Sequence, residues 1–320
     1  MPIGFHTSIA GGIDRSVTRA AETGCDAMQI FCHSPRMWKV KFPTDEVIAR
    51  FRAQREEAGL WPVVVHTSYL INLSTPDDEL YKRSRALFNF ELELCERLGV
   101  DYMVTHPGSH QGRGIEFAGA RIIEAFREAR EKAGTDHVRI LIENTAGGGT
   151  QTGRELTDLR GIIRSAPELE IGLCFDTCHG FAKGYSFTGS ADSSGADSKK
   201  TSKEAETSSL PATIDRELGL EHLKLIHLND SKGGAGSKID RHEHIGKGLI
   251  GKESLRAFIN HPKIIDIPLI LETPENEEGT DKTNLKTVKS MLTAQTKTAE
   301  TKSKQAEQSK QAGQSKKRIK

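Results

Sequence analysis

The chain has 320 residues, of which 36% are hydrophobic and 28% charged, and no apolar run is long enough to span a bilayer, so we exclude a membrane protein. Its net charge of +1 is unevenly divided, because residues 297–320 carry eight Lys or Arg and two Glu, or +6, which leaves −5 for residues 1–296. Nucleic acid would therefore have to bind through a local basic patch or bound cations rather than through bulk charge.

Short β-rich runs alternate with amphipathic helical patterns along the chain. The predicted strands are residues 3–6, 26–31, 62–66, 102–106, 138–143, 171–176, 222–227 and 267–272. The predicted helices are residues 13–23, 44–58, 76–98, 115–133, 154–165, 212–219, 252–260 and 281–292. Eight strand-helix units in one chain predict an α/β fold, a closed parallel (β/α)8 or TIM barrel, over residues 1–292.

Two segments lack apolar periodicity and are predicted to be disordered. Residues 188–210 form a Ser-, Ala- and Lys-rich insertion after the sixth strand, which we expect to be inert rather than to touch a ligand at the barrel rim. Residues 293–320 form a basic tail, which would either hold DNA weakly through its charge or only keep the chain soluble.

The five cysteines are scattered and odd in number, so they do not predict a disulfide framework. Free thiols fit a reducing compartment, and the N-terminus shows no secretory signal, so the expected location is the cytoplasm. Cys174 and Cys178 flank Asp176, but we expect these two thiols to pack against the barrel rather than to bind a metal.

Six successive strands, the third to the eighth, each end in a residue that can bind a metal ion. These residues are His66, His106, Glu143, Asp176, His227 and Glu272. All strand ends of a parallel barrel lie on one rim, and the first four residues are 40, 37 and 33 positions apart, about one strand-helix unit each. A lone histidine beside an apolar run is more often structural, but core packing does not explain six polar residues at equivalent positions. The pattern predicts a metal site at the C-terminal rim.

Three further candidates lie just beyond those strand ends. His179 lies three residues after Asp176, while Asp240 and His242 form an Asp-x-His pair in the glycine-rich loop after the seventh strand. Nine ligands, at roughly three or four per ion, are enough for about three divalent ions. Imidazoles and carboxylates without a required thiolate favour zinc, with manganese or iron as substitutes. His6, which ends the first strand, is expected at most to contact a metal ligand or a phosphate, not to bind a metal.

Longer motifs around these residues together resemble the endonuclease IV family, deoxyribonucleases that incise DNA at abasic sites. The motifs are VHTSYLINL, VTHPGSH, LIENTAG, IGLCFDTCHGFAKGY, HLNDSKGGAGSKIDRHEHIGKG and LILETP. The similarity runs from Ile3 to about Leu292, and its two longest motifs are highly specific. The resemblance implies a TIM barrel with three zinc ions at the C-terminal rim.

The resemblance also implies how the nine ligands divide among the three ions. The sets are His66, His106 and Glu143 for the first ion, Glu143, Asp176, His227 and Glu272 for the second, and His179, Asp240 and His242 for the third. Glu143 would bridge two ions, and Glu272 would orient the water that attacks the phosphorus 5′ to the lesion. The products would be a 3′-hydroxyl and a 5′-deoxyribose phosphate, and the same site would clean 3′-blocked ends. We find no GxSxG or P-loop motif.

Lesion recognition requires side chains that enter the base stack, because a nucleotide without a base is cheaper to flip out. Arg36, Tyr69 and Leu70 match the inserting residues of the family. Arg36 could instead be a solvated loop charge, and Tyr69 a rim aromatic. This chain departs from the family at His33–Ser34 and at Met37, where members often have lysine, asparagine and glutamine, so contacts at these positions are not implied.

The expected function is therefore a zinc-dependent abasic-site endonuclease of base excision repair that acts as a monomer on duplex DNA. One alternative is a sugar isomerase or epimerase on the same barrel, which holds a single metal ion. The third ligand set has no use in that chemistry. Another alternative is an inactive protein that binds damaged DNA, against which the complete ligand set argues.

Overall fold

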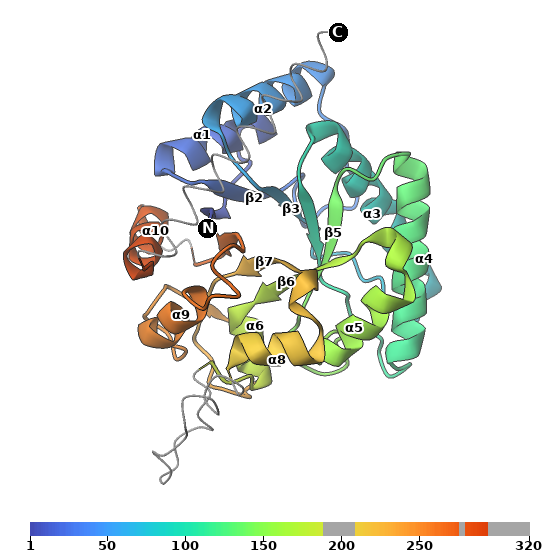
Figure 1. Cartoon of the computed structure of the whole chain (residues 1–320). Helices are drawn as coiled ribbons and strands as arrows, with labels where there is room; N and C mark the ends of the chain where they lie inside the picture. Colours follow the sequence, from blue (N-terminus) through green and yellow to red (C-terminus); the bar gives the residue numbers. More distant parts are fainter. Residues whose placement is uncertain (188–208, 275–278, 294–320) are drawn as a thin grey trace.

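The computed structural model contains a closed barrel of eight parallel strands, with helices packed around its outside (Figure 1). It describes residues 1–187, 209–274 and 279–293. The barrel strands are β1 (Ile3–His6), β2 (Ala27–Phe31), β3 (Val63–His66), β4 (Tyr102–Thr105), β5 (Arg139–Glu143), β6 (Gly172–Asp176), β7 (Leu223–His227) and β10 (Leu269–Leu271). Each strand pairs with its neighbour in the chain, and β10 closes the ring against β1. The predicted TIM barrel is confirmed.

Helices connect the strands and cover the outside of the barrel. They are α1 (Ile13–Thr23), α2 (Asp45–Ala58), α3 (Asp78–Leu98), α4 (Ile115–Ala133), α5 (Leu156–Ser165), α6 (Thr177–Lys183), α8 (Leu210–Glu217), α9 (Lys252–Ile259) and α10 (Thr280–Met291). Two 3-10 turns, η1 (Pro167–Leu169) and η2 (Leu220–His222), precede β6 and β7. Among the described helices, none is both long and apolar enough to cross a bilayer.

Helix α6 was not predicted, because its seven residues are too few to show helical periodicity in the sequence. It begins where Asp176 accepts a hydrogen bond from the backbone N–H of His179, at 2.7 Å. The predicted helix at 212–219 is α8, which starts earlier because Ser209 caps it and Leu210 is buried. The last two residues of the predicted insertion are therefore structured. Its remainder, 188–208, and the tail from 294 lie outside the described residues.

Alternate side chains of each strand point into the barrel, and this alternation determines where the site lies. One small or apolar side chain from each of seven strands fills the barrel interior, and these are Ala27, Val64, Val104, Leu141, Cys174, Leu225 and Ile270. The eighth strand contributes Gly4, where a Cβ atom would lie 1.8 Å from the backbone oxygen of Ala27. Side chains two residues apart in a strand share a face, so the next inward position forms a second layer nearer the C-terminal rim.

Candidate metal centre

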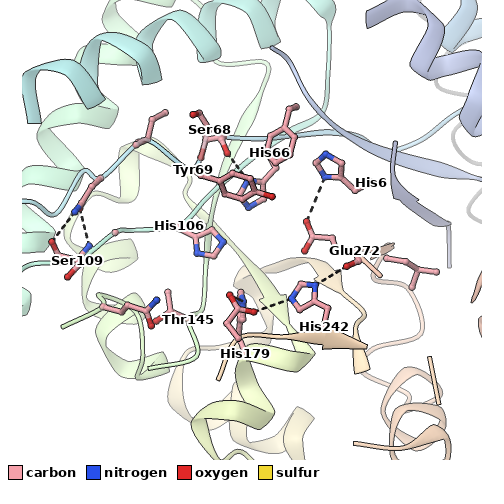
Figure 2. A pocket seen from close by; sticks show the side chains of 18 of the residues that line it. His6, His66, Ser68, Tyr69, His106, Ser109, Thr145, His179, His242 and Glu272 are labelled. Atoms are coloured by element: carbon pink, nitrogen blue, oxygen red, sulfur yellow. Dashed lines mark hydrogen bonds and ion pairs between the residues drawn. The ribbon is translucent and has the colours of Figure 1, made fainter. Parts of the chain in front are cut away.

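The second inward layer is polar around the whole ring, with one side chain from each barrel strand or its end. Its members are His6, Gln29, His66, His106, Glu143, Asp176, His227 and Glu272. His106 and Glu272 lie one residue beyond the observed ends of β4 and β10, within the usual variation of strand boundaries. Above this layer lies a cavity of about 570 Å³ that is lined by His66, His106, Glu272 and the loop residues beyond them (Figure 2).

Glu143 lies at the centre of the layer and is fully buried. One carboxylate oxygen, Oε2, lies 3.2 Å from Nε2 of His66 and 3.3 Å from Nε2 of His106. The other oxygen, Oε1, lies 3.0 Å from Nδ1 of His227 and 3.4 Å from Nδ1 of His179. A carboxylate that presents each oxygen to a different pair of imidazoles is placed to bridge two cations.

The predicted second set also comes together. The ligand atoms of Glu143, Asp176, His227 and Glu272 all lie within 4.8 Å of one another, as do those of His66, His106 and Glu143. Nδ1 of His227 lies 3.2 Å from Oε2 of Glu272. The structure therefore brings the first and second predicted sets together around their shared carboxylate.

The third set is assembled from α6 and from the loop after β7. Nε2 of His179 lies 3.0 Å from Oδ2 of Asp240, and Nε2 of His242 lies 3.4 Å from Oδ1 of the same carboxylate. Asp176 lies between this set and the second, because its Oδ2 is 3.6 Å from Nε2 of His242. The thiol of Cys178 also lies within 4.8 Å of ligand atoms of Asp240 and His242. Cys174, in contrast, packs in the barrel interior, as expected.

The imidazoles are oriented as metal ligands usually are, with one ring nitrogen held and the other facing the carboxylates. Nδ1 of His66, His179 and His242 is positioned to donate to the backbone oxygens of Thr67, Asn144 and Glu272, at 2.8, 2.9 and 2.9 Å. Nε2 of His242 is buried and has no hydrogen-bond partner within the described part of the chain. A buried nitrogen lone pair facing two carboxylates fits coordination to a cation.

The charges of the cavity also fit a cation. Burial by itself would raise the pKa of Glu143, but His106 and His227 hold the pKa of this carboxyl well below its usual range. Burial lowers the pKa of His106 to about 4. None of the described residues that line the cavity is a lysine or an arginine. Divalent cations would balance its carboxylates.

Three amides that were not predicted hold the ligands in place. The Gln29 amide donates to Oε1 of Glu272 at 2.6 Å, and its oxygen lies 2.8 Å from Nε2 of His227. Asn229 donates to Oδ2 of Asp176 at 2.6 Å, and Asn144 pairs with the backbone of the same residue. Their sequence signal was available, because each is a polar residue inside an otherwise apolar strand or within two residues of its end.

The predicted lesion-inserting residues lie on loops at the rim. Tyr69 lines the cavity (Figure 2). It is 67% exposed and stands edge-on to Phe31, with ring centroids 5.1 Å apart. Arg36 is exposed on the loop after β2. Leu70 is half-buried and packs against the hydrophobic core. The structure thus leaves Arg36 and Tyr69 free to meet a ligand, while Leu70 presents only part of its side chain.

All five cysteines are free, and four of them are buried. Burial raises the pKa of Cys25 and of Cys174 to about 12, so little reactive thiolate is present at neutral pH. We expect iodoacetamide at neutral pH to label the native protein at less than about a tenth of the rate seen after denaturation. Mass spectrometry would count the labels, and a thiol that reacts fast in the native protein would contradict this expectation.

The chain is similar to known proteins both in sequence and in structure. Residues 17–291 match the family described as Xylose isomerase-like TIM barrel. The chain is 41% identical over 293 residues to "Probable endonuclease 4" of Methanoculleus marisnigri, covering 91% of this chain and 99% of the relative. It is similar in structure to endonuclease IV from Thermus thermophilus, with a TM-score of 0.78, 36% identity and coverage of 91% and 99%. A D-psicose 3-epimerase, at 14% identity and a TM-score of 0.59 over 90% of each chain, shares the fold alone. The chain therefore belongs to the Xylose isomerase-like TIM barrel family and, within it, to the endonuclease IV family.

Proposed function

We infer that this chain is a metal-dependent endonuclease of base excision repair. It hydrolyses the phosphodiester 5′ to an abasic site in duplex DNA and leaves a 3′-hydroxyl and a 5′-deoxyribose phosphate. The observation that carries this proposal is the convergence of nine imidazole and carboxylate ligands in three sets at the mouth of the barrel. Relatives named endonuclease 4 that align with about nine-tenths of the chain support the choice of substrate.

Three zinc ions are the proposed cofactors, and the same ligand types also suit manganese. His66, His106 and Glu143 would hold the first ion, and Glu143, Asp176, His227 and Glu272 the second. His179, Asp240 and His242 would hold the third, with Asp176 close enough to contribute. When bound, the ions supply an activated water nucleophile and neutralise charge on the phosphate and on the leaving oxygen.

The protein's own groups orient the substrate and the attacking water. We assign the orientation of that water to Glu272, and this assignment is supported by its position in the cavity lining and by the Gln29 amide that fixes its Oε1. Glu143 is the second catalytic carboxylate, since it fixes four imidazoles around itself. Tyr69, Leu70 and Arg36 would enter the duplex, where a nucleotide without a base costs less to unstack. The same cavity would accept a 3′-blocked end, which presents an equivalent phosphodiester.

A sugar epimerase on the same barrel is the alternative. It would use a single ion held by the set of Glu143, Asp176, His227 and Glu272. The observation against it is the third set, because His179, Asp240 and His242 also converge although one ion needs none of them.

We further propose that the enzyme acts as a monomer inside the cell, where a bent duplex can reach the open rim.

The test uses a duplex with one abasic site, a matched intact duplex and the purified protein. We expect incision only of the abasic strand, with a 3′ end that a polymerase extends. Chelation should reduce the rate at least about a thousandfold, and added zinc should restore it. Turnover of a keto sugar without incision would favour the epimerase, and selective binding to the abasic duplex without cutting would show an inactive damage binder.

A further inference from the structure

Two loops at the rim carry the residues that we expect to enter the DNA. The first rim loop, residues 32–44, follows β2 and carries Arg36. The second rim loop, residues 67–72, follows β3 and carries Tyr69 and Leu70. Arg36 and Tyr69 are both exposed, so their placement depends on what holds the loops beneath them.

Helix α3 supports the first rim loop along its length. The guanidinium of Arg83 lies 4.1 Å from the centroid of the Trp38 ring, and the rings of Phe42 and Phe90 are 4.4 Å apart. Arg83 and Phe90 are seven residues apart and thus lie two turns apart on one face of the helix. The first rim loop therefore runs along one face of α3.

Glu91 of α3 joins the two rim loops. Its carboxylate is fully buried, and its Oε1 lies 2.6 Å from Nε2 of His33 in the first rim loop. The backbone N–H of Ser68 in the second rim loop donates to both of its oxygens, at 3.1 and 3.3 Å. The other ring nitrogen of His33 lies 2.8 Å from the backbone oxygen of Ser34. One buried carboxylate thus contacts both loops at the same time.

A second contact, which we group with the Glu91 contacts as the joint between the loops, connects the two rim loops directly. The hydroxyl of Ser68 donates to the backbone oxygen of Pro35 at 2.7 Å and accepts from the backbone N–H of Leu70 at 3.2 Å. Pro35 precedes Arg36, and Ser68 precedes Tyr69, so the joint lies one residue from each exposed side chain. A buried carboxylate that lost one of its partners would be strongly destabilised, so both loops must be in place together.

We propose that Glu91 is a positioning residue for lesion recognition, which with His33 fixes the two rim loops relative to each other and so sets the spacing of Arg36 and Tyr69. The inference rests on the proposed function, because it takes these two side chains to read the abasic site. Glu91 is fully buried and touches no substrate. It acts through the loops, and its loss should affect selection of the lesion more than the chemical step.

The test compares His33→Ala and Glu91→Gln with the parent protein. Glu93→Gln is the matched control, because Glu93 lies on the same helix and is exposed. We expect His33→Ala and Glu91→Gln each to raise KM for the abasic duplex about tenfold, with kcat within about twofold of the parent value. Affinity for the intact duplex and bound metal should stay unchanged. His33→Lys should restore KM, because a lysine ammonium can also pair with the Glu91 carboxylate.

A second readout reports the loop without any catalysis. The chain has two tryptophans, so Trp61→Phe leaves Trp38 as the single fluorophore, inside the first rim loop. In that background, His33→Ala should raise acrylamide quenching of Trp38 about twofold, because the loop loses its buried anchor. Unchanged KM and unchanged quenching in both His33→Ala and Glu91→Gln would overturn the proposal. If the parent protein failed to cut abasic DNA, the proposed function would fail instead. The quenching result would still test whether His33 and Glu91 hold the first rim loop in place.

Discussion

Replacing Glu143 with glutamine is expected to reduce the rate of abasic-site incision at least about a thousandfold, a loss of roughly 4 kcal/mol of transition-state stabilisation. The carboxylate is fully buried and presents each oxygen to two imidazoles at 3.0 to 3.4 Å. An amide of the same shape has one acceptor instead of two, and its NH2 group points donors toward nitrogens such as Nε2 of His66 and of His106, which must keep a free lone pair. It also removes the charge that two cations would share.

The measurement combines single-turnover incision with the metal content of the purified variant. We expect fewer bound ions per chain and, because bound ions stabilise the folded state, a lower thermal midpoint than that of the parent. Glu96→Gln is the matched control: the Glu96 side chain is only 7% exposed, but it pairs with Arg130 and accepts from the N–H of Val138 at the opposite end of β5. It should leave incision unchanged. Near-parental incision by Glu143→Gln would exclude this carboxylate from the reaction.

The barrel and the position of its site follow from local sequence patterns. Strand and helix periods differ, and a parallel barrel brings the C-terminal ends of all its strands to one rim. His66 and His227 could thus be placed together although 161 residues separate them in the chain. Each of these two histidines lies two residues after an interior residue, Val64 or Leu225, so the period of the strand accounts for their common layer.

Other parts of the site could not be predicted from local patterns. Gln29 appears in the sequence as one polar residue in an apolar run, and its contacts with Glu272 and His227 depend on the closure of the barrel. The antiparallel pair of β8 (Asp230–Ser231) and β9 (His242–Glu243) is too short for a sequence signal. That pair places His242 over the cavity. Short elements and buried amides are fixed by tertiary contacts, so their roles appear only in the folded chain.

Replacing Asp230 with asparagine is expected to lower the incision rate about a hundredfold and the free energy of unfolding by about 3 kcal/mol. Asp230 is fully buried at the start of the loop that carries Asp240 and His242. Its carboxylate accepts backbone hydrogen bonds at 2.8 to 3.3 Å from Ser231, Gly246, Gly248, Ile250 and Gly251. Gly248 packs so closely that a Cβ atom there would lie 2.5 Å from the Asp230 oxygen.

The asparagine keeps one acceptor and turns the other into a donor that faces backbone N–H groups, so at least two of these groups lose their partner. The loop should then loosen while the barrel stays intact. Limited proteolysis should cut within residues 232–250, and about one bound ion should be lost while those held by the strand ends remain. Asp215→Asn is the control, because Asp215 is exposed on α8 and pairs with Lys263. Parental metal content together with parental incision in Asp230→Asn would show that the loop holds its shape without this carboxylate.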